Sequence, residues 1–488
     1  MLSFGGSAVL EYVSAPIWLL TMLGLLAAVA IVDRVVSPAI RSITSTRRER
    51  AVERLNERLA VPIAPIKLVG RKALISQVML DPAVQAAIAT EVLHSGKSTR
   101  LVEAQAQRYA KEIVPAFSTA LYFKVGLRLA RKLSTALYRV RVGASDISSL
   151  QGIPPNASVV FVINHRSNMD YILVTYLASR SSALSYAVGE WARVPGLAGL
   201  IRLMGAYFIR RGSGNQLYRR VLARYVHIAT ASGVTQAVFP EGGLSRDGRL
   251  QPARLGLLSY MVADFDPGGA RDIVFVPVGL NYDRVLEDRV LVSAAAQVEL
   301  GQKPRFGFKL TKFLGFVSRM IAGRILGRWY KNGYACVSFG KPVSLKAYTT
   351  TKQIDFRTLT DERRTAEVTE LGATLIGEIG RAVPALPVSL VAAAFVSAHG
   401  QRVSSLELKA SVARLIAALQ ASGAQVYVPR ADDDYAVDVG LRMLMLRHLV
   451  TETAGLYEVV KGEETLVAYY ANAISHLLPT IECVENSD

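Results

Sequence analysis

Five short runs rich in valine, isoleucine and phenylalanine fall between residues 158 and 339 and alternate with stretches of helical periodicity. They are Ser158–Ile163, Ala183–Val188, Thr235–Phe239, Ile273–Gly279 and Ala335–Phe339. Such alternation is typical of a layered α/β fold. Each of the first four runs ends in a loop rich in glycine, proline, asparagine or charge, and open α/β sheets bind ligands at the carboxyl ends of strands. The pattern therefore predicts a sheet flanked by helices, with its chemistry at one edge.

The remainder of the 488-residue chain is predicted to be mainly helical. Residues 40–145 are amphipathic, and helical periodicity returns through 361–420 and 435–478. We expect four parts: an N-terminal membrane anchor at 1–38, a helical N-terminal region at 39–145, an α/β catalytic domain at 146–350 and a helical C-terminal domain at 351–488.

The composition excludes several classes of protein. Lysine and arginine number 57 against 39 aspartates and glutamates, a net charge of +18, and 51% of residues are hydrophobic. A chain this apolar is not disordered. With two cysteines, Cys336 and Cys483, it has no disulfide framework and no clustered-cysteine zinc site, and we expect no metal. The charge predicts a polyanionic partner: a nucleic acid, an anionic membrane or a phosphate-bearing substrate. The mean hydropathy of +0.27 favours the membrane.

An uncharged stretch of 21 residues, Tyr12 to Val32, is long enough to span a bilayer. Five arginines follow it by residue 50, and the positive-inside rule then places the rest of the chain in the cytoplasm. A cleaved secretory signal is the alternative, because Ala28-Val29-Ala30 resembles a cleavage site. Residues 1–11, however, lack the lysine or arginine of such a signal. We expect a protein of the cell inner membrane, with its catalytic domain on the cytoplasmic face.

A second basic stretch lies between Glu299 and Asp355, where no acidic residue occurs. Residues 303–331 carry eight lysines and arginines among phenylalanine, leucine and tryptophan. Basic residues beside aromatic ones suit an anionic membrane interface, so one interpretation is a second membrane contact. The other is an ordinary, partly buried helix with a solvated basic side.

The loop after the first predicted strand contains a histidine and an aspartate five residues apart. His165 and Asp170 lie across a strand-to-helix turn, with Ser167 or Asn168 as the N-cap and Asp170 in the first helical turn. An aspartate there can accept a hydrogen bond from one imidazole nitrogen. The other nitrogen is then fixed as a proton acceptor, which a general base needs. Alternatively, the pair only ties down the loop.

Three further loops follow hydrophobic runs. Arg210 and Arg211 are adjacent, and such a pair can bind a phosphate with bidentate geometry. Glu241 precedes two glycines, whose backbone N–H groups can approach a ligand closely, although a plain turn has the same pattern. The fourth run continues into a polar loop at residues 281–284.

In their order, these loops resemble the four sequence blocks of the glycerolipid acyltransferase superfamily. The blocks read Asn-His-Arg-Ser-Asn-Met-Asp-Tyr (164–171), Gly-Ala-Tyr-Phe-Ile-Arg-Arg (205–211), Phe-Pro-Glu-Gly-Gly-Leu-Ser-Arg (239–246) and Val-Pro-Val-Gly-Leu-Asn-Tyr-Asp-Arg (276–284). The first two forms resemble the glycerol-3-phosphate acyltransferase family in particular. The similarity covers about residues 130–480. Leu244 departs from the pattern, because the family often has arginine there.

The resemblance implies transfer of an acyl group from acyl-CoA or acyl carrier protein to the sn-1 hydroxyl of glycerol 3-phosphate. The product is lysophosphatidic acid, and the reaction is the first step of phospholipid synthesis. By this likeness His165 is the catalytic base and Asp170 orients it. The substrate-binding residues that it implies are Arg166, Ser167, Arg210, Arg211, Glu241, Gly242, Gly243, Ser245, Arg246 and Pro277. No cofactor other than the acyl thioester co-substrate is implied.

Three other functions remain open at this point. Within the superfamily, the acceptor could be lysophosphatidate or dihydroxyacetone phosphate. Outside it, a membrane-tethered basic protein could bind nucleic acid or anionic lipid, and its binding would then collapse with salt. That last function leaves the four ordered blocks unexplained, so we expect membrane lipids, glycerol 3-phosphate and the acyl donor as partners, and no nucleic acid.

Overall fold

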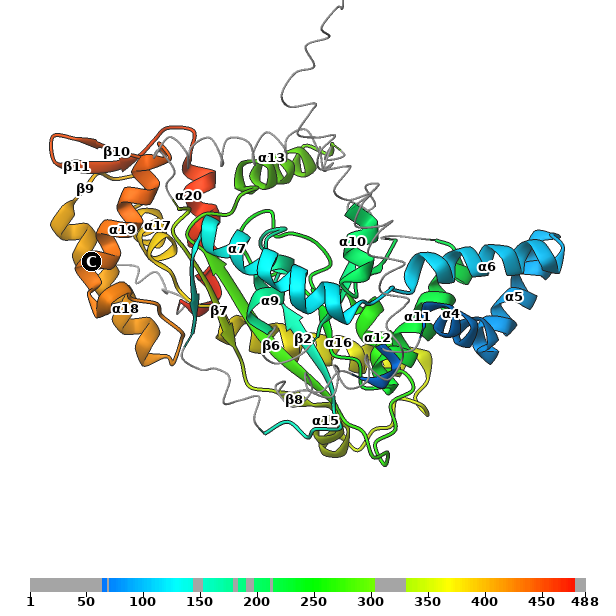
Figure 1. Cartoon of the computed structure of the whole chain (residues 1–488). Coiled ribbons are helices and arrows are strands. Elements are labelled where there is room, and N and C mark those ends of the chain that lie inside the picture. The colour runs from blue at the N-terminus through cyan, green and yellow to red at the C-terminus, as the bar shows by residue number, and fades with distance from the viewer. Residues whose placement is uncertain are drawn as a thin grey trace, which may run out of the picture.

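The structure is a computed structural model that describes residues 64–67, 70–143, 152–178, 183–189, 197–210, 214–302 and 331–478. The predicted anchor at 12–32, Arg211 and residues 303–330 of the basic stretch lie outside the described residues. A mixed sheet with helices on both faces forms the centre of the described part (Figure 1).

Eight strands of the described part form the central sheet. They are β1 (Arg139–Val142), β2 (Ser158–Ile163), β3 (Ser185–Val188), β4 (Tyr207–Phe208), β5 (Gln236–Val238), β6 (Ile273–Tyr282), β7 (Tyr334–Phe339) and β8 (Val343–Ser344). The order is β1-β7-β6-β2-β5-β3-β4, with β8 paired to β6. Strands β6, β2, β5, β3 and β4 run parallel, and β7 runs antiparallel to β6. Five carboxyl ends therefore meet at one edge, as expected of an α/β sheet.

All five predicted strands are present, and two differences are informative. β6 runs to Tyr282, three residues past the predicted end at Gly279, because its pairing with β7 continues from Val278↔Phe339 to Tyr282↔Ala335. β1 had no predicted counterpart, since Arg139–Val142 alternates two arginines with two valines on a largely exposed edge strand. A signal read from apolar runs misses a strand with so little buried surface.

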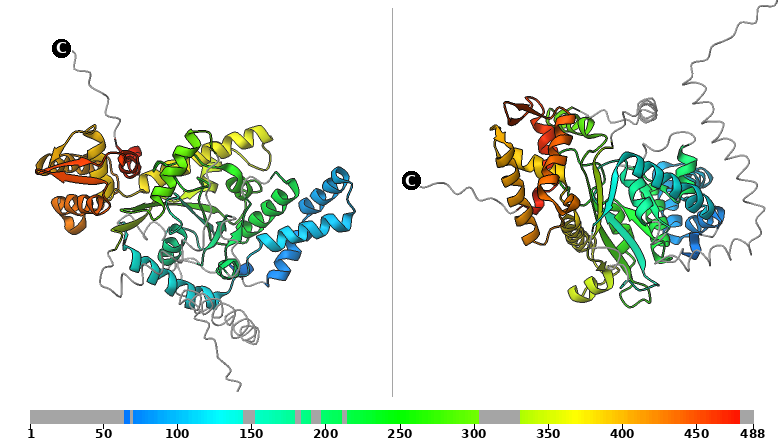
Figure 2. Two further views of the ribbon diagram at one scale, coloured as in Figure 1. Left: turned by 90° about the horizontal axis from the view of Figure 1, so that it is seen from above. Right: turned by 60° about the vertical axis from the view of Figure 1, so that its left-hand side comes forward.

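Two helical layers enclose the sheet (Figure 2). One face, with Val159, Phe161 and Ile163 of β2, packs against α7 (Leu127–Leu137) and α9 (Asp170–Ala178). The opposite face, with Val160 and Val162, packs against three helices. These are α11 (Gln216–Ala231), α12 (Leu255–Val262) and α16 (Asp361–Ala382). The alternation of β2 between the two cores explains why every one of its residues is buried.

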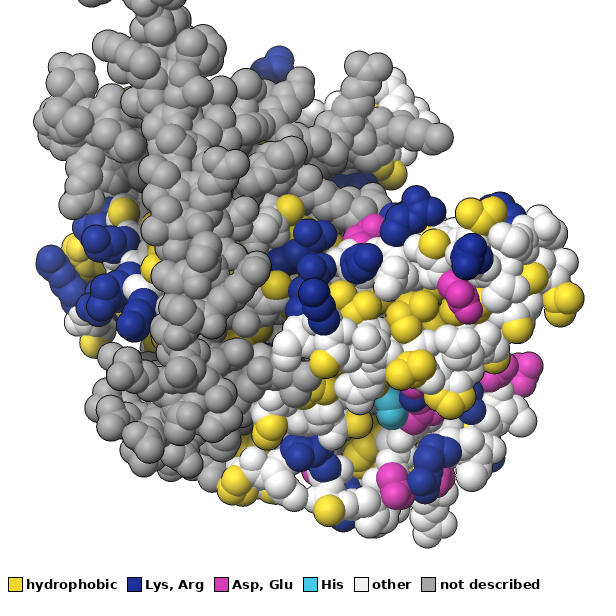
Figure 3. Space-filling view, turned by 45° about the vertical axis from the view of Figure 1, so that its right-hand side comes forward, with side chains coloured by type: hydrophobic (Ala, Val, Ile, Leu, Met, Phe, Trp, Pro, Cys, Tyr) yellow, Lys and Arg dark blue, Asp and Glu magenta, His cyan; other side chains and the backbone are white. Residues whose placement is uncertain are grey.

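The N-terminal helices extend the second layer beyond β4. They are α4 (Arg71–Leu80), α5 (Pro82–Ser95) and α6 (Thr99–Ile113), which pack against α11. In the described part of the chain, no single helix has the length and apolar composition of a membrane span; α4 and α5 do so only as a pair bent by 63°. Leu80, Leu93 and Leu101 of these helices are exposed, and Figure 3 shows hydrophobic and basic side chains next to one another on this side.

The C-terminal region contains the predicted helices and also a small sheet. The helices are α17 (Pro387–Ser397), α18 (Ser405–Ala421), α19 (Asp433–Leu446) and α20 (Glu464–Ala471). Helices elsewhere in the described part are α10 (Leu197–Leu203), α13 (Asp288–Glu299) and α15 (Leu345–Lys352). Strands β9 (Val403–Ser404), β10 (Val450–Thr453) and β11 (Leu456–Val459) are antiparallel. Ala454 and Gly455 join β10 to β11 with positive φ angles of 55° and 79°. A two-residue turn of this kind usually carries Asn-Gly, so Ala-Gly gave no hairpin signal.

Helix α16 lies directly on β6 at a glycine. A Cβ added to Gly279 would lie 2.2 Å from the carbonyl carbon and oxygen of Ala382, at the end of α16. A helix and a strand can approach this closely only where one side chain is missing. Gly279 is the predicted end of the strand, but in the structure β6 continues past it, and the missing side chain allows α16 to pack closely there.

We predict that Gly279→Ala lowers the free energy of unfolding by about 1–3 kcal/mol or more, because the helix must move off the sheet. Gly377→Ala is the matched control: it lies in α16, where an added Cβ meets nothing within 4 Å. There alanine should stabilise the helix by about 0.5–1 kcal/mol. Urea unfolding of the three proteins measures both effects, and equal effects at the two positions would contradict the close approach.

Candidate active site

The end of β2 is joined to β6 by an asparagine side chain. The Nδ2 of Asn164 donates to the carbonyl of Leu280 at 2.9 Å, and its Oδ1 accepts from the N–H of Leu280 at 2.7 Å. The amide thus reproduces the hydrogen bonds of one more strand residue. It fixes the point at which the chain leaves the sheet and enters the loop of residues 164–170, called here the 164–170 loop.

The histidine and aspartate of the 164–170 loop are in contact. His165 Nδ1 lies 2.9 Å from Asp170 Oδ2, and both side chains are almost fully buried. Asp170 is the first residue of α9, in the predicted first turn. Because a carboxylate accepts hydrogen bonds, the proton of a neutral His165 is assigned to Nδ1, which leaves Nε2 as an acceptor. The hydrogen bond expected from the spacing of five residues is therefore present.

Asp170 also organises the backbone of the 164–170 loop. Its Oδ2 accepts from the N–H groups of Arg166 at 2.7 Å and Ser167 at 3.0 Å. Its Oδ1 accepts from the hydroxyl of Tyr282 at 2.6 Å. A buried carboxylate needs such donors, because water cannot reach it. Tyr282 was not among the residues predicted for the site.

Aromatic rings and one buried glutamate hold His165 from the other side. Its ring stacks on Phe239, with centroids 4.1 Å apart, and meets the edge of Tyr171 at 5.5 Å. Its backbone N–H donates to Glu241 Oε1 at 2.7 Å, and its carbonyl accepts from the N–H of Ser245 at 2.9 Å. The first and third sequence blocks therefore meet around the histidine, as their positions at the ends of β2 and β5 predict.

Glu241 bridges two backbone groups. Its Oε2 accepts from the N–H of Gln251 at 3.0 Å, while Oε1 binds His165. Burial raises the pKa of Glu241 to about 7, against the lowering effect of the donated hydrogen bonds. In the structure Glu241 therefore supports the backbone on both sides of the site.

We predict that Glu241→Gln flattens the dependence of stability on pH. A carboxyl with a higher pKa in the folded chain gives a contribution that is complete below its ordinary value of 4.5 and is lost as pH rises through about 7. The wild type should therefore lose unfolding free energy between about pH 5 and pH 8, by at most about 1.4 kcal/mol per pH unit from this group. Urea unfolding across this range measures the slope. Glu103→Gln, at an exposed position on α6, is the control and should keep the wild-type slope; an unchanged slope in Glu241→Gln would refute the assignment.

Ser167 and Asn168 are bound by a carboxylate from the loop after β6. Ser167 Oγ donates to Glu287 Oε2 at 2.8 Å, and Asn168 Nδ2 donates to Glu287 Oε1 at 3.0 Å. Burial raises the pKa of Glu287. A surface pocket of about 290 Å³ lies beside Glu287 and is also lined by Arg284, Arg289 and Arg447.

Arg166 and Arg210, both expected to bind substrate, have partners in the protein. The buried guanidinium of Arg166 donates to the carbonyls of Gly248 and, at 3.1 Å, Ala473. Arg210 forms a bidentate ion pair with Glu112, with N–O distances of 2.9 and 2.7 Å. Arg210 follows β4, three strands from β2, which is about 14 Å along the sheet edge at a spacing of about 4.8 Å per strand.

The remaining predicted residues lie on or near the same edge. Arg246 is exposed, and within the described residues it forms no ion pair. Gly242 has a φ of +70°, and a Cβ there would lie 2.5 Å from Cδ of Arg254; Gly243 is the next residue of the loop. Pro277 is buried within β6 opposite Val162. Among the described residues, no group of three or more histidine, cysteine, aspartate or glutamate side chains could hold a metal.

Two protein-family models match the chain. Residues 145–281 match the family described as acyltransferase, and residues 323–480 match the glycerol-3-phosphate acyltransferase C-terminal region. The first match includes the 164–170 loop and Glu241.

Several Pseudomonas proteins named glycerol-3-phosphate acyltransferase are similar. That of Pseudomonas putida (strain W619) is 28% identical over 425 residues, 83% of this chain and 49% of the relative. That of Pseudomonas fluorescens is 31% identical over 339 residues, 67% of this chain and 38% of the relative. The chain thus spans about half the length, or less, of these relatives. A crystal structure of the 1-acyl-sn-glycerophosphate acyltransferase of Thermotoga maritima is 18% identical, with a TM-score of 0.30, and the match covers 63% of this chain and 97% of that one.

Proposed function

Because this chain belongs to the glycerol-3-phosphate acyltransferase family, we propose that it acylates the sn-1 hydroxyl of glycerol 3-phosphate. The acyl donor is acyl-CoA or acyl carrier protein, and the product is lysophosphatidic acid. The observation that carries the proposal is the buried hydrogen bond between His165 Nδ1 and Asp170 Oδ2 at the carboxyl end of β2. It fixes the orientation of the imidazole and leaves Nε2 as the nitrogen that can accept a proton, which general-base catalysis of an acyl transfer requires.

In the proposed reaction, His165 Nε2 accepts the proton of the acceptor hydroxyl as its oxygen attacks the thioester carbonyl. The tetrahedral intermediate places a negative charge on the former carbonyl oxygen, where backbone N–H donors can stabilise it. When the carbon–sulfur bond breaks, the imidazolium returns the proton to the departing thiolate. Asp170 stabilises the transient positive charge on His165 throughout. The products are the ester and the free thiol, and His165 is neutral again.

The phosphate of the acceptor needs cationic ligands. We assign Arg246 this role first, because it lies in the same loop after β5 as Glu241 and forms no ion pair within the described part of the chain. Arg210 and Arg211 remain candidates from the resemblance; Arg210 would have to exchange Glu112 for the phosphate. Gly242, Gly243 and Ser245 are proposed to shape the glycerol site, and Pro277 the acyl site.

The proposed product is a lipid, so we place the enzyme at a membrane. The uncharged stretch at residues 12–32 and the arginines after it support an anchor in the inner membrane with the catalytic domain on the cytoplasmic face. The basic, aromatic residues 303–331 are proposed as a second contact with membrane lipids. We propose no nucleic-acid partner and no cofactor besides the thioester.

Thiol release from palmitoyl-CoA, with and without an acceptor, tests the function directly. Glycerol 3-phosphate, lysophosphatidate and dihydroxyacetone phosphate are supplied separately to the purified chain. The largest kcat/KM should belong to glycerol 3-phosphate. Faster turnover with one of the other acceptors would replace the assignment within the superfamily, and no acceptor-dependent release from either palmitoyl-CoA or palmitoyl acyl carrier protein would refute it.

We predict that His165→Ala and Asp170→Asn each lower kcat by about 10²- to 10⁴-fold, the usual cost of losing general-base catalysis. Steady-state kinetics with circular dichroism to verify folding measures the effect. His94→Ala, an exposed histidine on α5, is the control and should keep wild-type turnover. Near-wild-type kcat in both site variants would refute the proposed roles.

We predict that Arg246→Ala raises the KM for glycerol 3-phosphate by about 10- to 150-fold, the value of one charge-assisted hydrogen bond, with little change in the KM for the thioester. Arg210→Ala and Glu112→Ala serve as a comparison. If Arg210 only pairs with Glu112, these two variants should share a small loss of thermal stability and keep the wild-type KM. A KM increase confined to Arg210→Ala would instead move the phosphate site to the end of β4.

A further inference from the structure

Asp170 is held from outside its own loop by one side chain. The hydroxyl of Tyr282 donates to Asp170 Oδ1 at 2.6 Å, whereas Oδ2 accepts from His165 and from the backbone of the 164–170 loop. Tyr282 is 1% exposed and Asp170 0%. The 164–170 loop supplies no donor to Asp170 Oδ1. Among the described residues, its donor is the hydroxyl of Tyr282. Because both side chains are buried, loss of this hydrogen bond would leave the oxygen with a desolvation cost that water does not readily offset.

The length of β6 explains how Tyr282 reaches this position. In the parallel pairing of β2 and β6, the last residue of β2, Ile163, lies opposite Val278. β6 continues for four more residues past the end of β2, to Tyr282. Side chains alternate along a strand, so Val278, Leu280 and Tyr282 share the face on which α9 packs, and all three belong to its core. The overhanging strand therefore carries the tyrosine over the 164–170 loop to the start of α9.

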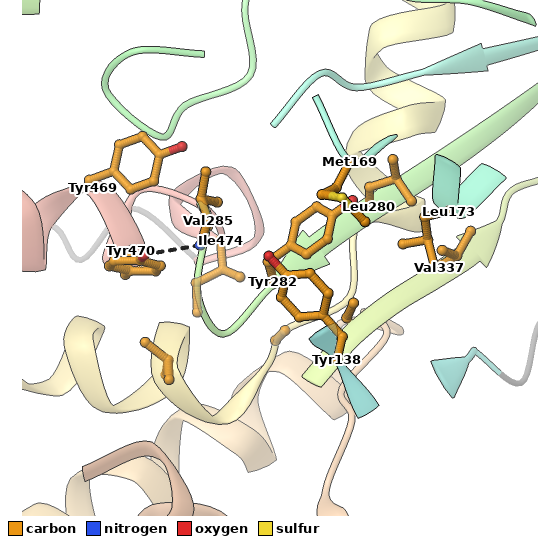
Figure 4. Close-up of a cluster of buried hydrophobic side chains, with 14 of the residues drawn as sticks. Tyr138, Met169, Leu173, Leu280, Tyr282, Val285, Val337, Tyr469, Tyr470 and Ile474 are labelled. Atoms are coloured by element: carbon orange, nitrogen blue, oxygen red, sulfur yellow. Dashed lines mark hydrogen bonds between the residues drawn. The ribbon is translucent and has the colours of Figure 1, made fainter. Parts of the chain in front are cut away.

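A second tyrosine fixes the ring of the first. Tyr138 packs against Tyr282 with ring centroids 5.2 Å apart, and Figure 4 shows the two side by side in the buried cluster. The hydroxyl of Tyr138 donates to the carbonyl of Arg284 at 2.9 Å and so anchors the chain just after β6. Burial raises the pKa of the Tyr282 hydroxyl, and the negative charge of Asp170 raises it further, so the group remains a donor. Tyr138 is equally buried and carries the same hydroxyl, but it bonds elsewhere.

We propose that Tyr282 is a positioning residue that acts on the reaction through Asp170. Its O–H holds the carboxylate plane so that Oδ2 faces His165 Nδ1, and the imidazole in turn presents Nε2 to the acceptor. The inference rests on the proposed function, in which His165 is the base. Tyr282 is then a third residue of the group formed by His165 and Asp170. It belongs to the fourth sequence block, whereas the other two belong to the first.

Tyr282→Phe tests the inference because it removes only the hydroxyl and keeps the ring against Tyr138. We expect kcat to fall by about 10- to 150-fold, as for the loss of one hydrogen bond to a charged group. The KM values for glycerol 3-phosphate and palmitoyl-CoA should change little, since Tyr282 is buried and its hydroxyl is bonded to Asp170. Tyr138→Phe is the matched control: it removes the neighbouring hydroxyl, which bonds to the carbonyl of Arg284 and not to Asp170, and kcat should stay close to that of the wild type. Thermal unfolding of both variants verifies that each folds.

A double-mutant cycle separates positioning from general loosening of the core. If Tyr282 acts through Asp170, Tyr282→Phe should cost little further kcat in an Asp170→Asn background, because the carboxylate it orients is already gone. Incorporation of labelled glycerol 3-phosphate into lipid is sensitive enough for such slow variants. A full second loss would show that the tyrosine acts on packing alone.

The outcomes distinguish this inference from the proposed function. Wild-type thiol release that does not depend on glycerol 3-phosphate would overturn the function itself. Wild-type turnover together with an unchanged kcat in Tyr282→Phe, or with an equal loss in Tyr138→Phe, would overturn only the role of Tyr282. The predicted combination is a loss of kcat confined to Tyr282→Phe and absent when Asp170 is replaced.

Discussion

The parallel pairing of β2 with β6 is the interaction on which the rest of the site depends. Six consecutive residue pairs join the two strands, from Ser158↔Ile273 to Ile163↔Val278. This register decides where β2 ends relative to β6, and the amide of Asn164 then seals the junction to Leu280. A shift of one residue would turn every side chain of one strand to the opposite face. The contact between His165 and Asp170 would keep its local geometry, but its supports would be displaced.

Local features of the site could be predicted from the sequence because they depend on neighbours in the chain. The five-residue spacing of His165 and Asp170 across a strand-to-helix turn suffices to bring the two side chains together, and the structure contains that hydrogen bond. The partners that arrive from elsewhere gave no comparable signal. Tyr282 is 112 residues from Asp170, and Glu287 is 120 residues from Ser167. The register and length of β6 bring Tyr282 and Glu287 to the 164–170 loop. The predicted strand ended at Gly279, three residues too early to indicate this.

The partners of the arginines could not be predicted from the sequence motifs, for a different reason. Arg166, Arg210 and Arg246 look alike in a motif, since each follows a strand and could bind a phosphate. In the structure their surroundings differ: Arg166 is buried against two carbonyls, Arg210 faces Glu112, and Arg246 is exposed. A residue type specifies what a side chain can bind, whereas its burial and its partners decide what it does bind. Pairings with Glu112 and Ala473 are long-range, so no local pattern encodes them.

The contact of Arg166 with Ala473 also has a consequence for the timing of synthesis. The two residues are separated by 307 positions. At about 5–20 residues per second, the ribosome needs roughly 15–60 s to make that interval. During this time Arg166 lacks its acceptor at Ala473, although every strand of the central sheet is made before Ala473. A nascent chain can therefore assemble much of its core before the last contact around the candidate site forms.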